Sequence, residues 1–354
     1  MVTKKQVDYD AYISSLQQEI ELRKDYLHEP VRTIYFGGGT PSLLGIKDLE
    51  HILTCLHKSF DLSQVEEITL EGNPEQLSLE YCQQMHQIGF NRISIGVQSF
   101  FPHVLKFMGR RHSGMEATNA VNNAKAAGFD NISIDLIYGV SQRNDFEWCK
   151  DVETAFSSPI THLSCYALTS EENSILYKQI QNAQQMPIDD EQAARNYKTL
   201  LELLPKYGFE QYEVSNFAKP GFESKHNSSY WNHTPYLGLG PSAHSFDGQY
   251  RHWNHSDLKK YCSTVKRLKP YGGREKLTKK DLFNETVLLG LRTRNGLDLS
   301  SMEEKYGKKK VAVLMDYFHD KVRPEYYEEK ESRLRLTETG LWFADGIAGD
   351  AFLI

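Results

Sequence analysis

Four polar side chains, Glu71, Gln98, Arg110 and Asp135, end or closely follow short apolar stretches of the sequence. In a parallel α/β fold, functional groups gather at the carboxyl ends of the strands, so we expect these four side chains to form a polar ring around one mouth of the sheet. Asp135 is the strongest single candidate, because a carboxylate inside an apolar strand is costly unless it has a partner or a function. Such a ring can bind an amino acid and a ribose at once.

A glycine-rich segment, Gly37–Ser42, follows the first predicted strand and reads Gly-Gly-Gly-Thr-Pro-Ser. Glycines let a ligand approach the backbone closely, and exposed backbone amides can bind polar groups. The alternative interpretation is a plain flexible turn. A dinucleotide-binding loop is disfavoured, because Ser42 stands where the last glycine of that motif belongs.

The five cysteines are scattered, at Cys55, Cys82, Cys149, Cys165 and Cys262. No pair has the close spacing of a zinc knuckle or of an iron–sulfur cluster loop. An odd number without a spacing pattern also gives no disulfide framework. Taken alone, the cysteines predict no bound metal.

Secondary-structure elements alternate in the first two-thirds of the chain. Short β-branched or apolar runs predict strands at 33–36, 68–70, 93–95, 132–134, 162–166 and 212–214. The segments between them have helical spacing, as in the apolar stripe from Tyr9 to Ile20. Repeated βα units predict a parallel sheet, either open or rolled into a barrel.

The alternating pattern of strands and helices ends at about residue 216. We expect three parts: a βα unit over 1–216, a connecting segment rich in Gly, His, Asn and aromatic residues over 217–270, and a mainly helical domain over 271–354. In the last part, we expect helices at 280–291, 299–306 and 309–320, then a hairpin between 334–336 and 341–343.

The composition excludes several classes of protein. The 354 residues carry a net charge of −6 and are 40% hydrophobic. Mild acidity with mixed signs argues against a broad nucleic-acid surface. The lack of a long apolar run predicts no membrane span, and the first residues contain no apolar core of a secretory signal. We therefore expect a cytoplasmic protein.

Five motifs occur in one order along the chain: Gly37–Ser42, Glu71–Glu75, Gly96–Phe100, Arg110 and Asp135–Gly139. Together they resemble the radical S-adenosylmethionine (SAM) proteins similar to oxygen-independent coproporphyrinogen III oxidase, over about residues 8 to 350. The chain length and the segment His226–Trp231 are more similar to the heme chaperone branch of that family. The resemblance implies a partial parallel βα barrel of the radical SAM type with a small, mainly helical C-terminal domain.

The resemblance also implies SAM-binding roles for Gly38, Gly39, Thr40, Glu71, Gln98, Arg110, Asp135 and Ala167. The first three would hold the amino and carboxylate end of SAM, and the two carboxylates would contact polar groups of the cofactor. Gln98 and Arg110 would orient its ribose and carboxylate, and Ala167 would pack beside the adenine.

The heme chaperone branch associates a His-Asn…Tyr-Trp motif with heme binding. His226 would be the leading heme contact, with Asn227, Tyr230 and Trp231 beside it. Without the family context, an aromatic-rich packed loop is the plainer interpretation of this segment.

The chain departs from the family at its start. The family opens with a strand that leads into Cys-x-x-x-Cys-x-x-Cys, whose three thiolates hold the [4Fe–4S] cluster that reduces SAM. The region just after that motif aligns with about Met1. We expect truncation rather than native loss, with the cluster bound by the full-length protein only. The chain as written should then cleave neither SAM nor porphyrinogen carboxylates. A smaller departure is Ser141, where the family usually has proline.

Three functions follow as hypotheses. The first is a heme chaperone that delivers heme to acceptor proteins, with SAM and the cluster as accessory cofactors. The second is a coproporphyrinogen III oxidase that decarboxylates its substrate by radical chemistry, and the third is a non-catalytic binding scaffold. The histidine and aromatic residues of His226–Trp231 favour the first over the second.

Overall fold

The computed structural model describes residues 9–172, 174–269 and 271–353. These residues form two compact units. The first takes in the described parts of Met1–Ile34, Gly45–Glu66 and Lys225–Ile354, and the second contains Tyr35–Leu44 and Glu67–Ser224. The domain boundaries near residues 216 and 270 stay a prediction.

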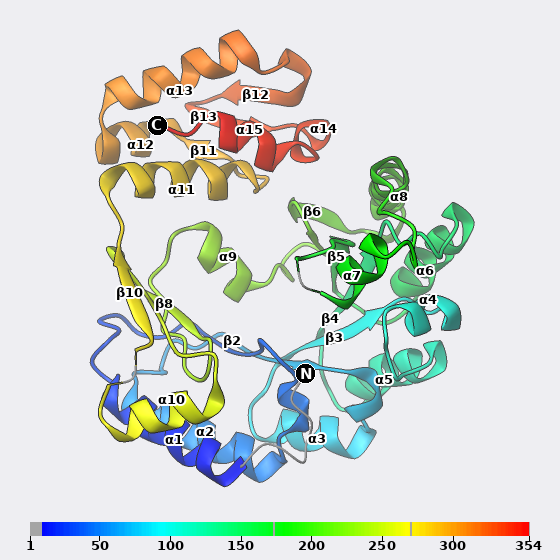
Figure 1. Ribbon diagram of the computed structural model, residues 1–354, viewed down its shortest axis with the longest axis vertical. Helices are drawn as coiled ribbons and strands as arrows, with labels where there is room; N and C mark the ends of the chain where they lie inside the picture. Colours follow the sequence, from blue (N-terminus) through cyan, green and yellow to red (C-terminus); the bar gives the residue numbers. More distant parts are fainter. Residues whose placement is uncertain (1–8, 173, 270, 354) are drawn as a thin grey trace. The chain divides into compact units, whose positions relative to one another are not determined.

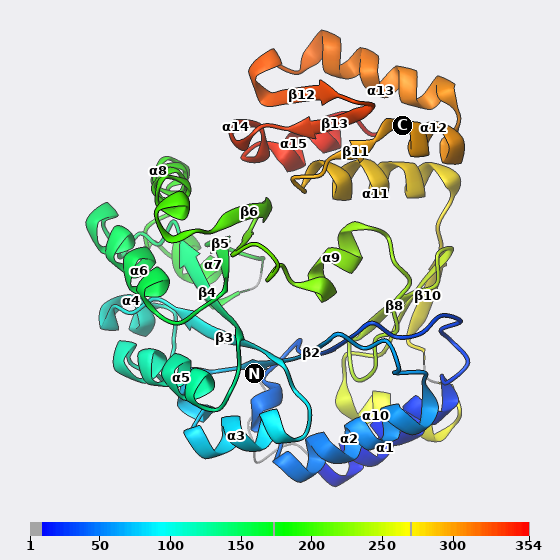
Figure 2. The ribbon, with the colours of Figure 1, turned by 180° about the vertical axis from the view of Figure 1, so that it is seen from behind.

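The second unit is built on a curled sheet that has seven strands within the described residues (Figures 1 and 2). The strands are β1 (Thr33–Phe36, which begins in the first unit), β2 (Glu67–Gly72), β3 (Arg92–Gln98), β4 (Asn131–Tyr138), β5 (His162–Ala167), β6 (Glu210–Glu213) and β7 (Asn216–Ala218). Their spatial order is β1-β2-β3-β4-β5-β7-β6, and β2 to β5 pair in parallel. The predicted partial βα barrel is therefore confirmed.

Helices cover one face of this sheet. They are α3 (Leu79–Gln87), α4 (Pro102–Phe107), α5 (Gly114–Ala126), α6 (Asp145–Ser157) and α8 (Asp190–Leu203). The unit also contains the short helix α7 (Ile175–Gln181) and the 3-10 turns η1 (Pro41–Leu43), η2 (Pro74–Gln76) and η3 (Leu204–Tyr207). Figures 1 and 2 show α3, α5, α6 and α8 along the same face. Helix α5 packs against β3 and β4 through small side chains, among them Ala117, Ala120 and Ala124.

The two faces of the strands differ in chemistry. In the parallel register Ile93 lies beside Ile132, whereas Ser94 lies beside Ser133. Because side chains alternate between faces, one face of the sheet is apolar and packs on the helices, and the other face is polar. Ser133 is nevertheless fully buried, so the polar face lines an interior.

The far edge of the sheet differs from the prediction. The strand expected at 212–214 was to extend the parallel series, but β6 does not pair with β5. Strand β7 lies between them and pairs antiparallel with both. The chain reverses within two residues after Glu213, and so short a turn can join only antiparallel strands.

The first unit combines N-terminal and C-terminal segments. Its elements before residue 277 are α1 (Tyr9–Leu22), α2 (Ile46–Ser59), α9 (Lys225–Trp231), α10 (Leu258–Lys266) and the antiparallel strands β8 (His244–Phe246), β9 (Tyr250–Trp253) and β10 (Gly273–Lys276). Helix α1 packs on α2 and α10.

A buried carboxylate anchors α1 to this unit. Glu19 accepts hydrogen bonds from Arg23 (3.0 Å), Asn254 Nδ2 (2.7 Å), the Tyr261 hydroxyl (2.7 Å) and the Gly240 amide (2.8 Å). The side chains of Glu19 and Arg23 are 0% and 2% exposed. Four donors therefore offset the cost of burying this charge.

The C-terminal part is mainly helical, as expected. It contains α11 (Lys279–Leu291), α12 (Leu299–Tyr306), α13 (Lys308–Lys321), η4 (Pro324–Tyr326), α14 (Glu338–Leu341), α15 (Ala344–Asp350) and strands β11 (Leu297–Asp298), β12 (Tyr327–Lys330) and β13 (Arg333–Leu336). The helices expected at 280–291, 299–306 and 309–320 are confirmed.

The predicted hairpin between 334–336 and 341–343 is wrong. Strand β13 pairs with the preceding β12, and Leu341 ends helix α14. The turn between the two strands consists of Glu331 and Ser332, both with positive φ (52° and 61°). A tight hairpin turn with two positive φ angles usually carries Asn-Gly. Glu331 and Ser332 are not residues typical of this turn, so the sequence did not indicate it.

Within the described residues, no helix combines the length and the apolar character that a bilayer crossing demands.

Candidate functional site: the glycine loop and a ring of polar side chains

The glycine loop after β1 has a specific steric requirement. A Cβ on Gly37 would lie 2.4 Å from Tyr35 Cε1 and 2.7 Å from Glu71 Oε1, so a larger residue there would displace the Tyr35 ring or the Glu71 carboxylate. Gly38 has a φ of +74°, which glycine adopts without strain. Apart from the chain neighbours, no atom of the described residues lies within 4 Å of the Cβ position at Gly38 or Gly39. The loop therefore leaves space where a ligand can approach the backbone.

Glu71 holds this loop. It is the fifth residue of β2, and its carboxylate accepts hydrogen bonds from the Tyr35 hydroxyl (2.8 Å) and the Gly38 amide. Burial raises the pKa of Glu71, and the two hydrogen bonds oppose that rise. Tyr35 was not predicted as a site residue. Its only sequence signal is its place one residue before the end of the strand.

Asp135 lies in β4 beside two hydroxyls. Ser94 Oγ donates to its carboxylate at 3.4 Å, and the Ser164 hydroxyl from β5 also bonds to it. Removal from water, and after it the charge of Glu71, raises the pKa of Asp135 to about 6. The two carboxylates therefore lie close enough to repel each other, and together they suit a ligand with an ammonium group and hydroxyls.

Gln98 and Arg110 meet over Gly96. A Cβ on Gly96 would lie 3.1 Å from Gln98 Nε2, 3.5 Å from Asn73 Oδ1 and 3.9 Å from Arg110 Nη1. Burial lowers the pKa of Arg110, and the charge of Asp135 opposes this. The Arg110 guanidinium thus links the side-chain amides of Gln98 and Asn73 to the carboxylates of Glu71 and Asp135. Asn73, which lies 3.5 Å from Arg110, was missed because an asparagine before proline is typical of a turn.

The structure therefore brings together Glu71, Gln98, Arg110 and Asp135, the four side chains of the predicted ring. Thr40 begins the turn into η1, where its carbonyl accepts from the Leu43 amide at 3.1 Å. Ala167 ends β5 as an exposed residue. The contacts of all these residues with a ligand stay a prediction.

The residues present fit SAM but not its cluster. The open glycine backbone, two carboxylates and a guanidinium match the polar groups of an amino acid and a ribose. Among the described residues, no three His, Cys, Asp or Glu side chains come together as a metal site requires. The five scattered cysteines are unpaired thiols and supply no three-thiolate set.

The predicted heme segment is helical and belongs to the first unit. Helix α9 has no buried residue, although it contains a tyrosine and a tryptophan. His226 uses both ring nitrogens: Nδ1 lies 2.9 Å from Thr33 Oγ1, and Nε2 lies 3.1 Å from the Tyr230 hydroxyl. Thr33 was missed, because nothing in a strand residue far away in the sequence indicates this contact. The packed-loop interpretation is wrong about the loop, because the segment is a helix, but its aromatic rings do pack on neighbouring side chains.

The other residues of the segment have different surroundings. The Tyr230 ring, which is 37% exposed, meets Tyr236 edge-on at 4.8 Å. The Arg292 guanidinium lies 5.4 Å from the centroid of the Trp231 indole and covers it. Asn227 is half-buried on the same helix. A second histidine, His233, lies 3.4 Å from Glu285 and was not singled out in the sequence.

Comparisons with known proteins identify the family. The Radical SAM superfamily matches residues 3–155, and the HemN C-terminal domain matches residues 277–343. The heme chaperone HemW of Lactococcus lactis is 34% identical over 342 residues, which are 96% of this chain and 88% of the relative. This chain belongs to the HemW family.

Other HemW proteins match over similar lengths. HemW of Mycobacterium tuberculosis is 35% identical over 96% of this chain and 86% of its own. HemW of Bacillus subtilis is 32% identical over 97% of this chain and 91% of its own. The family resemblance predicted from the sequence motifs is thus confirmed.

A solved structure shows the same fold. The coproporphyrinogen III oxidase HemN from Escherichia coli, described as a radical SAM enzyme, superposes with a TM-score of 0.86 at 22% identity. The match covers 99% of this chain and 85% of that one. At this identity the match supports the fold of this chain and not its activity.

Proposed function

We propose that this chain is a heme chaperone that binds heme at α9 and SAM at the polar ring of the second unit. Heme is the cargo, to be delivered to acceptor proteins in the cytoplasm. The observation that carries the proposal is helix α9, on which the Tyr230 ring is 37% exposed and His226 and Trp231 are half-buried. The name that the HemW relatives share supports it.

The partly exposed aromatic rings of α9 suit a flat apolar ligand. A planar macrocycle buries aromatic surface well, and sites for such ligands are lined mainly by apolar and aromatic side chains. An imidazole is a common axial ligand of heme iron. His226 is therefore the leading contact, with Asn227, Tyr230 and Trp231 beside the ring.

SAM would bind in the second unit. Gly38, Gly39 and Thr40 would hold its amino and carboxylate end, and Gln98 with Arg110 would orient its ribose and carboxylate. Ala167 would pack by the adenine. In radical SAM proteins a [4Fe–4S] cluster reduces SAM, and our proposal assigns none of the five cysteines of this chain to such a cluster.

Titration with hemin tests the chaperone proposal. The full chain should shift the Soret band of hemin at stoichiometric amounts, and His226→Ala should abolish that shift. The matched control is His319→Ala, because His319 of α13 is an exposed histidine paired with Glu329 of strand β12. An unchanged spectrum in the unsubstituted chain would sink the proposal.

The alternative is a coproporphyrinogen III oxidase, favoured only by the likeness of the fold to HemN. Anaerobic turnover of coproporphyrinogen III by the chain, without a hemin-dependent Soret shift, would support this alternative instead.

A further inference from the structure

The turn that carries Gln98 is strained. Ser99 donates its amide to the Val97 carbonyl at 2.9 Å, which closes a three-residue turn with Gln98 at its centre. The φ of Gln98 is +68°, and a turn of this hand is rare because it is unfavourable for a residue with a side chain. The pairing with β4 also shifts between Ile95 and Gln98, so the turn re-aims the Gln98 side chain.

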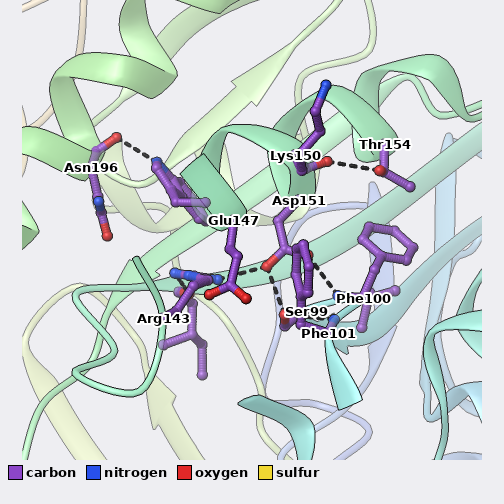
Figure 3. A network of polar contacts seen from close by, with 12 residues as sticks. Ser99, Phe100, Phe101, Arg143, Glu147, Lys150, Asp151, Thr154 and Asn196 are labelled. Carbon is purple, nitrogen blue, oxygen red and sulfur yellow. Dashed lines mark hydrogen bonds and ion pairs between the residues drawn. The ribbon is translucent and has the colours of Figure 1, made fainter. Parts of the chain in front are cut away.

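The carboxylate of Asp151 holds the two residues that follow Gln98. Asp151 of α6 accepts the Ser99 hydroxyl at 2.6 Å and the Phe100 amide at 2.7 Å (Figure 3). Arg143 donates to the same carboxylate at 2.7 Å. The side chains of Asp151 and Arg143 are both 0% exposed. Ser99, the last residue of the strained turn, and Phe100, the residue after it, are thus fixed from outside the sheet.

The same ion pair reaches the neighbouring strand. Arg143 donates its second terminal nitrogen to the Ile137 carbonyl of β4 at 2.6 Å. Its guanidinium lies 4.4 Å from the centroid of the Trp148 indole, whose N–H donates to Asn196 O at 2.6 Å. Asp135 lies two residues before Ile137. The pair therefore connects Ser99, which follows Gln98 at the end of β3, to Ile137 near the end of β4, two residues beyond Asp135.

We propose that Asp151, supported by Arg143, is a positioning residue that holds the strained turn so that the Gln98 amide faces the bound SAM. The inference rests on the proposed binding of SAM at this mouth. Buried ion pairs are weak devices for stability alone, because desolvation consumes most of their attraction. The Asp151–Arg143 pair lies beside the turn at Gln98, and the backbone of this turn would relax if nothing held it.

A merely structural role is distinguishable from a positioning role. If Asp151 only attached α6 to the sheet, its loss would weaken SAM binding regardless of the residue at position 98. If Asp151 acts through Gln98, its loss should have no further effect once the Gln98 side chain is removed, because the two changes then remove the same contact.

Calorimetric titration of the full chain with SAM tests this coupling. Asp151→Asn keeps the shape of the side chain, and we expect it and Gln98→Ala each to weaken binding about tenfold. The double variant should bind no more than about twofold more weakly than Gln98→Ala. Glu153→Gln is the matched control, because Glu153 is an acid of the same helix paired with Lys150 (2.7 Å). Affinity losses that multiply, or unchanged binding in Asp151→Asn, would overturn the inference.

A second measurement does not depend on SAM. Gln98→Gly relieves the strain, because glycine adopts a positive φ freely. We then expect Asp151→Asn to lower the ratio of folded to unfolded protein in both backgrounds, by a factor that is about fivefold larger in the Gln98→Gly chain. In the chain that retains Gln98, the substitution also releases the strained turn, and this release offsets part of the lost stability. Equal losses in the two chains would overturn the strain that the inference requires. If the unsubstituted chain does not bind SAM, the proposed SAM site fails, and this unfolding cycle still decides the role of Asp151.

Ser99→Ala is a milder variant, should Asp151→Asn fail to fold. It removes one of the hydrogen bonds to Asp151 and leaves the ion pair. We expect it to weaken SAM binding about threefold, again without a further effect in the Gln98→Ala chain. A loss that persists in that chain would count against positioning.

Discussion

The hydroxyl of Tyr230 lies 3.1 Å from Nε2 of His226, one helical turn away on α9. The other ring nitrogen, Nδ1, already lies 2.9 Å from Thr33 Oγ1. Both nitrogens of this imidazole are therefore engaged before a ligand binds. Coordination of an iron atom requires a nitrogen lone pair, so one of these two hydrogen bonds must break on heme binding.

Tyr230→Phe removes the hydroxyl that competes for Nε2. Because a neutral hydrogen bond contributes about 1 kcal/mol, we expect heme affinity to rise up to about fivefold, with the aromatic ring retained. Hemin titration by absorbance measures the change. Tyr317→Phe on α13 is the control and should leave the affinity unchanged. Weaker binding in Tyr230→Phe would instead show that the hydroxyl contacts the heme.

Asp135 should make stability depend on pH. Its pKa is raised to about 6 from the usual 3.8, so the folded protein holds this proton more tightly than the unfolded chain does. Its contribution to stability is then fully present below pH 3.8 and is lost as the pH rises through about 6. Asp135→Asn lacks this dependence. Relative to that variant, the unsubstituted chain should lose about 2 kcal/mol between pH 4 and pH 7.5.

Urea unfolding followed by the fluorescence of Trp148 measures this difference, since Trp148 is buried in the same unit. Taking the difference between the two proteins at each pH removes the contribution of titrating groups that do not interact with Asp135, so the measured change belongs to Asp135 and its neighbour Glu71 together. A difference that is constant with pH would mean that Asp135 is ionised normally in the folded protein.

Tyr35→Phe should loosen the glycine loop. The Tyr35 hydroxyl is one of two donors to Glu71, and its loss removes a bond that holds the Glu71 pKa down. The pKa of Glu71 should rise further, and SAM affinity at neutral pH should fall about tenfold. Binding in the variant should improve more steeply with rising pH than in the unsubstituted chain.

The control for this prediction is Tyr81→Phe. Tyr81 lies in the same unit and donates to the Leu44 carbonyl at 3.1 Å, without contact to Glu71. It should leave SAM affinity and its pH profile unchanged. An equal loss of affinity in both variants would point to a general loosening of the unit.

Glu19→Ala should strongly destabilise the first unit. It leaves the Arg23 guanidinium buried without its counter-charge, which costs about 3 to 5 kcal/mol of unfolding free energy. Replacing both residues with methionine should cost less than the sum of the single changes, because no unpaired charge remains. Urea denaturation measures these values.

Glu21→Ala is the matched control on the same helix. Glu21 pairs with Lys24 on the exposed side of α1, and such a pair contributes about 0 to 1 kcal/mol. A similar loss in Glu19→Ala and Glu21→Ala would contradict the anchoring role of Glu19.

Local patterns of the sequence determined much of this protein. The alternation of strands and helices predicted a parallel sheet, the family resemblance narrowed this to a partial barrel, and apolar spacing located α11, α12 and α13. The motifs around Glu71, Gln98 and Asp135 predicted a shared mouth, because the carboxyl ends of parallel strands meet at one edge. Residue type and periodicity are local properties, so they can be read without knowing the contacts.

Only the tertiary structure decided which groups hold the site. The residues of each contact are separated in sequence and meet through the strand register and the packing of α6 and α9. These contacts join Tyr35 to Glu71, Thr33 to His226, and Asp151 to the turn at Gln98. The same holds for β7, whose place between β5 and β6 depends on a two-residue reversal. The strained turn at Gln98 is the clearest case. Glutamine does not favour that conformation by itself, and the hydrogen bonds that hold it come from a helix more than 40 residues away.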